Sequence, residues 1–103
     1  MKQRAVYWSD SAFADLEASA DFIALGSPGY AASFVERVRK AARSLETLSE
    51  RGRIVPEFAS EDIRELLVQQ YRLLYRVEAD SVVILALIHQ HRDLSELLKP
   101  LGL

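Results

Sequence analysis

The chain has 103 residues, of which half are apolar and 27% are charged, and its formal net charge is −2. These values predict one globular domain over residues 1–103, and the absence of cysteine excludes disulfides and thiolate metal sites. The slight acidity argues against direct nucleic-acid binding, which usually needs an excess of cations for the phosphates. The longest apolar run, Val82 to Ile88, is too short to cross a membrane. We therefore expect a cytoplasmic protein without metal or other cofactor.

The N-terminal half predicts a strand followed by two helices. Residues 3–8 end in the β-prone run Val-Tyr-Trp, and Ser9 offers a capping oxygen for a helix. Apolar side chains then recur three and four positions apart, first at Phe13, Leu16, Ala20 and Ile23, then at Phe34, Val38, Ala41, Ala42, Leu45 and Leu48. Residues 26–29 form a break between the helices, and Gly52 is a natural stop for the second. Because the link is short, the helices should lie antiparallel.

The C-terminal half predicts strands. After a connector over residues 53–62, three antiparallel strands are expected over 63–70, 71–77 and 81–91. Residues 93–98 could form a short terminal helix. The predicted fold class is therefore α+β, with an N-terminal strand and an αα-hairpin packed on one face of an antiparallel sheet, in the order β-α-α-β-β-β.

Strand alternation predicts that several arginines lie on the sheet face left open by the hairpin. Side chains two residues apart share a face. The open face is expected to carry Arg64, Leu66, Val68, Arg72, Leu74 and Arg76. At the end of the last strand, His89 and His91 should point to the same side.

Four motifs resemble those of the ParE/RelE toxin superfamily, in the same order along the chain. They are Arg51-Gly52-Arg53-Ile54-Val55-Pro56-Glu57, similar to a GR-x-VPE connector; Ile63-Arg64-Glu65-Leu66, similar to an I-R-E-L strand; Tyr71 to Val77, similar to a Y-R-[LIV]-x-Y-R strand; and Val82 to Asp93, similar to a final strand that ends in H-x-x-RD. Together they cover essentially the whole chain, which is identified as a ParE-like member.

The resemblance implies a growth-inhibiting toxin of a type II toxin–antitoxin pair, of the kind associated with plasmid stabilisation. ParE-like members poison DNA gyrase, whereas RelE-like members cut mRNA on the ribosome. The implied partners are a ParD-like, DNA-binding antitoxin with a flexible tail and DNA gyrase as the target. Membrane is not expected as a partner, and nucleic acid is expected only through the target.

The residues favour a protein-binding gyrase inhibitor over an enzyme. RelE-like nucleases resemble one another in strong positive charge, and many have a tyrosine near the C-terminus, but this chain is slightly acidic and has no tyrosine after Tyr75. Guanidinium groups on an open face can bind the carboxylates of a partner. The candidate partner-binding residues are Arg64, Arg72, Arg76, His89, His91 and Arg92.

Two alternatives stay open at this point. A ribosome-dependent mRNA endoribonuclease could use His89 and His91 as acid and base, with Arg76 near the phosphate. An inert member would only bind its antitoxin. The histidines could equally be ordinary polar residues at a strand end.

The candidate arginines and the apolar strand also have purely structural interpretations. Each arginine could pair with Glu65, Glu78 or solvent, and an ion pair between Arg53 and Glu57 is expected to hold the connector. The last strand is apolar and β-prone, so an antitoxin tail could cover the open face or extend a sheet edge by strand addition. The leucine-rich C-terminal segment could fold over that face instead.

Overall fold

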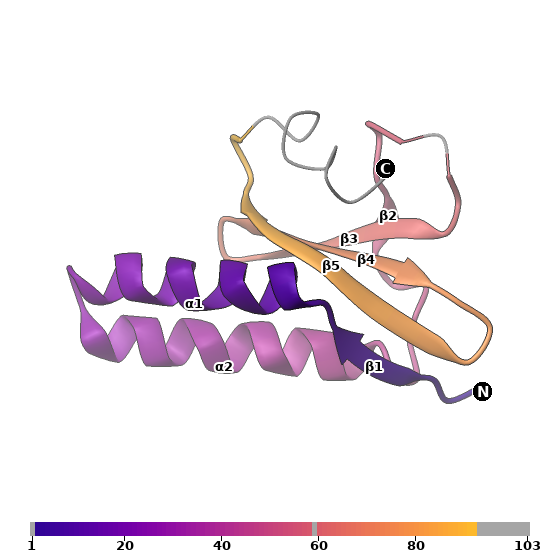
Figure 1. The fold of residues 1–103 in the computed structure, drawn as a ribbon, viewed down its shortest axis with the longest axis horizontal. Coiled ribbons are helices and arrows are strands. Elements are labelled where there is room, and N and C mark those ends of the chain that lie inside the picture. Colours follow the sequence, from indigo (N-terminus) through magenta and orange to yellow (C-terminus); the bar gives the residue numbers. More distant parts are fainter. Residues whose placement is uncertain (1, 59, 93–103) are drawn as a thin grey trace.

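The computed structural model describes residues 2–58 and 60–92, and it confirms the predicted α+β fold. The elements are β1 (Ala5–Trp8), α1 (Asp10–Ala24), α2 (Pro28–Ser44), β2 (Arg53–Ile54), β3 (Ile63–Val68), β4 (Tyr71–Val77) and β5 (Ser81–His89). The strands form one sheet in the order β1-β5-β4-β3-β2, and the two helices run side by side along it (Figure 1). The helix considered for residues 93–98 lies outside the described residues. No helix within the described ranges is long and apolar enough to span a membrane.

Two features of the sheet differ from the simple antiparallel expectation. Strand β1 runs parallel to β5, with Ala5 opposite Ser81 and Trp8 opposite Ile84. The connector also contributes the two-residue strand β2, which pairs with the middle of β3. Neither pairing leaves a local pattern in the sequence, because β1 is separated from its partner by most of the chain and β2 is too short to alternate.

A serine caps the N-terminus of each helix, as predicted for Ser9. The Ser9 hydroxyl accepts from the Ala12 N–H at 3.1 Å, and the Ser27 hydroxyl accepts from the Tyr30 N–H at 3.1 Å. Helix α2 ends at Ser44, so the predicted continuation to Leu48 is wrong, and Leu48 is exposed. The chain beyond α2 instead turns towards the N-terminal segment, where the Glu46 carbonyl accepts from the Arg4 N–H at 2.8 Å.

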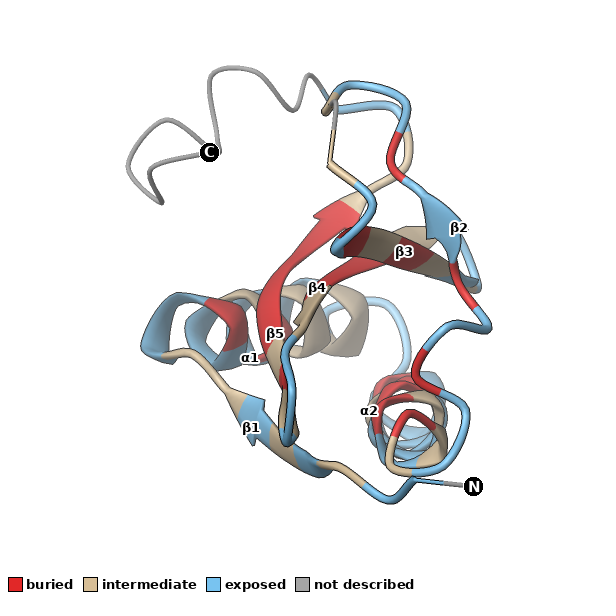
Figure 2. Ribbon diagram, turned by 90° about the vertical axis from the view of Figure 1, so that its right-hand side faces the viewer, coloured by how far each residue is buried: buried red, intermediate tan, exposed pale blue. Residues whose placement is uncertain are grey.

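The sheet has a buried apolar cluster on each face. Figure 2 shows the buried residues that β4 and β5 contribute. On the helix side the cluster consists of Ala12, Leu16, Phe34, Val38, Ala42, Leu45, Leu73, Tyr75, Val82, Ile84 and Leu87. On the other side, called the open face below, it consists of Val55, Ile63, Leu74, Leu85, Ala86 and Ile88. Phe13 belongs to neither cluster and is 55% exposed, because the small Ala12 takes the inward position on α1.

The predicted face of β3 is wrong. Leu66 and Val68 pack against the helix-side cluster, so Arg64, which alternates with them, also lies on the helix side. The antiparallel register explains this placement, because Arg64 is opposite Tyr75 and Leu66 is opposite Leu73. The prediction had assigned the apolar residues of β3 to the open face, and burying them beneath the hairpin is the more stable arrangement.

Candidate partner-binding site

A network of four charged side chains crosses the open face and binds the connector to the sheet. Glu65, on β3, is only 4% exposed and accepts hydrogen bonds from Arg53 and from Arg72 Nε. The other two nitrogens of Arg72 donate to the two oxygens of Glu57, each at 2.9 Å. This bidentate pairing is the strongest geometry available to an arginine and a carboxylate. The expected Arg53–Glu57 pair does not form, because each residue pairs with a more deeply placed partner on the sheet.

The network shifts the proton affinities of its members. Hydrogen bonds from Arg72 hold the pKa of Glu57 below its ordinary value, against a smaller opposing effect of burial. In turn, the hydrogen bonds to Glu57 raise the pKa of Arg72 above its ordinary value. Both shifts favour the charged forms of Arg72 and Glu57, and therefore the ion pair between them.

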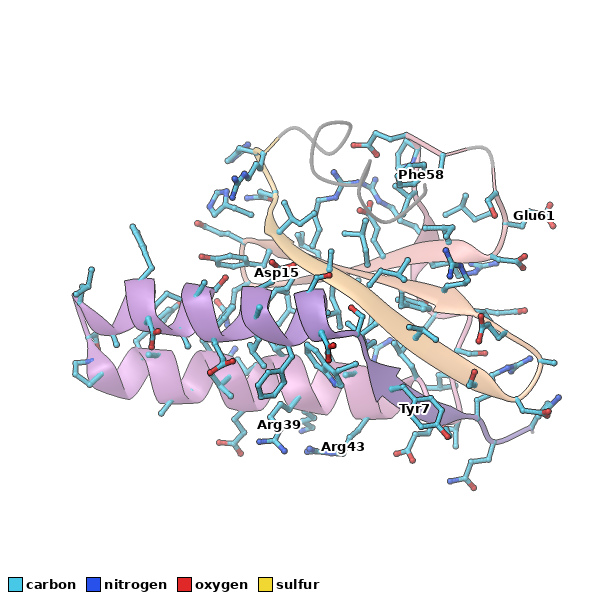
Figure 3. The ribbon with its side chains drawn as sticks, in the orientation of Figure 1. Tyr7, Asp15, Arg39, Arg43, Phe58 and Glu61 are labelled. Atoms are coloured by element: carbon cyan, nitrogen blue, oxygen red, sulfur yellow. The ribbon has the colours of Figure 1, made fainter. Side chains whose placement is uncertain are left out.

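The connector also covers part of the apolar open face. Val55 is fully buried, and its N–H donates to the Ile63 carbonyl at 3.2 Å. Phe58 packs against the open-face cluster, and Figure 3 shows it on the connector beyond the edge of the sheet. The face that the helices leave uncovered is therefore partly covered by residues 55–58.

The three candidate arginines have different surroundings. Arg72 is 8% exposed and committed to the network. Arg64 lies on the helix side, where it donates to the Gly52 carbonyl at 2.9 Å and thus holds the loop after α2. Arg76 is half-buried on the open face, and within residues 2–58 and 60–92 its side chain has no hydrogen bond or ion pair. Of the three, Arg76 has the guanidinium group best placed to receive a partner.

The histidines lie together at the far end of β5. Their ring centroids are 5.4 Å apart, and the His89 ring also meets the Tyr71 ring edge-on at 5.3 Å. Tyr71 is opposite His89, whereas Arg76 is five positions further along β4 and faces the other side of the sheet. At about 3.3 Å per residue, that separation is roughly 17 Å along the strand. The structure therefore does not bring Arg76 together with the two histidines.

Arg92 and His89 line a cavity of about 430 Å³ between α1 and β5. The same cavity contains Asp15 of α1, which the sequence analysis did not single out. The Asp15 carboxylate accepts from the Leu87 N–H at 3.1 Å, and burial raises its pKa, against the opposing effects of that N–H and of Arg92. One signal in the sequence points to this position: Ser11, Ala18 and Ser19 are small residues on the same side of the helix and allow a close approach.

Within the described ranges, no group of three or more His, Asp or Glu side chains could hold a metal ion. The donor sets that are present are arginines, carboxylates paired with them, and one pair of imidazoles. Such groups are suited to recognising another macromolecule through charge-assisted hydrogen bonds.

Comparison with known proteins agrees with this arrangement. A family model described as "ParE toxin of type II toxin-antitoxin system, parDE" matches residues 6–94. The chain belongs to the ParE toxin family. This confirms the family indicated by the four motifs, and it makes the chain a type II toxin.

Comparison with solved structures supports the ParE fold. One similar chain comes from the structure described as "Chromosomal ParDE TA system from P. aeruginosa", with a TM-score of 0.70 and 22% sequence identity. The match covers 84% of this chain and 96% of that one. No curated protein sequence matches. At this identity, the structural likeness shows that the two chains share a fold.

Proposed function

We propose that this ParE-family toxin acts in the cytoplasm by binding and inhibiting DNA gyrase, and that a co-expressed antitoxin neutralises it. The observation that carries the proposal is the state of Arg72, which is buried and bound to two carboxylates. RNA cleavage would need a free cation beside a positioned acid and base. With Arg72 neutralised and Arg76 far from the histidines, the open face does not combine these groups and is better suited to binding protein.

Arg76 is the proposed centre of the gyrase-binding surface. It lies on the open face beside the partly buried Val83, its neighbour in the sheet. Leu67, on the same face of β3, is 63% exposed. Arginines and apolar side chains on one surface are typical of the energetically important centre of a protein interface.

Induced expression without an antitoxin tests this proposal in cells. We expect a DNA-damage response to rise while protein synthesis continues. Arg76→Glu should reduce growth inhibition strongly, because it reverses the charge at the proposed contact. Lys40→Glu, on the exposed face of α2, is the matched control and should leave growth inhibition unchanged. Arrest of protein synthesis before any DNA damage would contradict the proposal.

The histidine pair favours a second candidate, a ribosome-dependent mRNA endoribonuclease. Two imidazoles 5.4 Å apart, with Arg92 nearby, could supply an acid, a base and a cation. A double variant, His89→Gln with His91→Gln, separates the candidates. Retained toxicity rules out acid–base catalysis by these residues, whereas loss of toxicity in a folded variant, together with cut mRNA in the wild type, would favour the nuclease.

A further inference from the structure

Among residues 2–58 and 60–92, half of β5 has no strand partner on the side of β1. Strand β1 pairs with β5 only from Ser81 to Ile84, and then the chain leaves the sheet at Ser9 to enter α1. Beyond that point, residues 85–89 are paired with β4 alone among the described strands. A free strand edge presents backbone N–H and C=O groups that can pair with another chain.

Two side chains from the start of α1 take the place of a neighbouring strand along this edge. The Asp15 carboxylate accepts from the Leu87 N–H at 3.1 Å, and the Ser9 hydroxyl donates to the Leu85 carbonyl at 3.3 Å. Figure 3 shows Asp15 at the boundary between α1 and the sheet. A charged side chain pointing at a strand edge is a known device against unwanted pairing. These hydrogen bonds satisfy the edge without a partner and can be exchanged for those of an added strand.

Beside this edge lies the cavity of about 430 Å³ described above. Its helical wall consists of small side chains, Ser11, Ala18 and Ser19, and it ends at Phe22, which is 64% exposed. The small residues leave room next to the backbone of β5, and Phe22 offers an apolar contact at one end. The groove thus brings backbone groups of β5 and an apolar contact within reach of an extended segment.

The charge of the groove indicates which charged side chain such a segment would carry. Asp15 is half-buried and bears a negative charge that burial makes unfavourable, so an incoming cation would relieve a cost already present in the free protein. Arg92 also lines the groove, and its positive charge offsets part of this cost.

We propose that this groove binds an extended segment of the antitoxin, which pairs with residues 85–89 of β5 as an added strand. A backbone carbonyl of the segment replaces Asp15 on the Leu87 N–H, and the released carboxylate pairs with a lysine or arginine of the segment. The inference rests on the proposed neutralisation by an antitoxin. It adds three points to that function: the edge of β5 that binds the antitoxin, the role of Asp15 in covering this edge in the free toxin, and the positive charge of the bound segment.

The test measures binding to the full-length product of the reading frame next to this gene. We expect Asp15→Lys to raise the dissociation constant by about tenfold or more, because it places a like charge against the segment's cation. Asp21→Lys makes the same charge change on another side of α1 and should change binding less than about twofold. Circular dichroism establishes that both variants are folded.

A second variant does not depend on charge. Ala18→Trp fills the groove from an exposed helix position and should also weaken binding, whereas Ala32→Trp, exposed on α2, should not. In the wild-type complex, the Leu87 amide should exchange with solvent more slowly than in the free toxin.

Tight binding unaffected by Asp15→Lys and Ala18→Trp would overturn this inference and leave the proposed function standing. Failure of the wild type to bind the neighbouring product at all would overturn both. A homodimer of the free toxin that Asp15→Lys dissociates would assign the groove to a second copy and overturn the inference.

Discussion

At the scale of single residues, the strongest charge interactions of the described chain hold its own connector. Glu65 is buried and accepts hydrogen bonds from Arg53 and Arg72. Arg72 also forms a bidentate ion pair with Glu57. Burying a carboxylate is costly unless its charge is paired. The net contribution of such a network to stability is small, but it fixes where the connector lies on the open face.

Removing Arg72 should therefore cost much more than removing Glu57. Arg72→Ala leaves Glu65 buried without its inner partner, and we expect the free energy of unfolding to fall by about 3–5 kcal/mol. Glu57→Gln leaves Arg72 its second carboxylate, and Glu57 is 41% exposed, so the loss should stay below about 1 kcal/mol. Urea denaturation followed by circular dichroism measures both. Equal losses would contradict the central place of Glu65 in the network.

Asp15 predicts a pH dependence of the opposite sign to that of most carboxylates. Because its pKa is raised in the folded protein, the folded state holds this proton more tightly than the unfolded chain. The stabilisation that this proton gives is complete below the ordinary pKa of 3.8. It is lost as the pH rises through the raised pKa of the folded protein. Asp15→Asn keeps an oxygen for the Leu87 N–H without the charge. Near neutral pH it should be at least as stable as the wild type, and the difference should vanish in acid.

Denaturation at both pH values tests this account of Asp15. A loss of stability in Asp15→Asn near neutral pH would mean that the charge itself stabilises the fold. Neither the contact of Asp15 with Leu87 nor the partner of Glu57 could be identified from sequence, since both interactions join residues that are distant along the chain. Pairing of an arginine with Glu65 was foreseen as an alternative, but the predicted face of β3 placed Glu65 on the opposite side of the sheet from Arg72. Only the observed register with β4 brings the two residues to one face.

At the scale of elements, the loop between α2 and β2 is fixed by one close approach. The Gly52 N–H donates to the Tyr75 hydroxyl at 2.9 Å, and a Cβ at this position would lie 2.5 Å from that hydroxyl and from the Glu65 carbonyl oxygen. Gly52 is needed here because the loop packs against the sheet. The sequence suggested a different role for it, as the end of a helix that in fact stops at Ser44.

Two substitutions separate the steric and hydrogen-bonding parts of this contact. Gly52→Ala should destabilise the protein by about 1–3 kcal/mol, since the backbone of β3 must move to admit the methyl group. Tyr75→Phe should cost about 1–3 kcal/mol, because it leaves the buried Gly52 N–H without an acceptor. Thermal denaturation measures both. A neutral Gly52→Ala would show that the loop can move away from the sheet at no cost.

Local patterns predicted the elements better than their pairing. Helix caps, the spacing of apolar residues and strand alternation located α1, α2, β3, β4 and β5. The parallel pairing of β1 depends on where distant segments meet, and so does the β-bulge between Leu74 and Tyr75. The side of β3 was mistaken because both of its faces contain leucine, and only the register with β4 decides which leucine is buried.

At the scale of the whole molecule, helices cover one face of the sheet and the connector covers part of the other (Figure 2). Two surfaces are left for partners: the neighbourhood of Arg76 on the open face and the free edge of β5. They lie on different sides of the sheet, so the proposed target and antitoxin would use separate contacts. The family and the fold were predicted from motifs and confirmed, whereas the roles of Arg64, Arg72, Arg76, His89, His91 and Arg92 stay predictions.

The most direct measurement of the proposed activity is a cleavage assay with purified gyrase, ATP and supercoiled plasmid. With increasing toxin, we predict linear DNA held in a cleaved complex and a parallel loss of supercoiling activity. Arg76→Glu should remove both effects, and Lys40→Glu should retain them. Unchanged gyrase products at a toxin concentration that cuts mRNA in a reconstituted translation reaction would contradict the account.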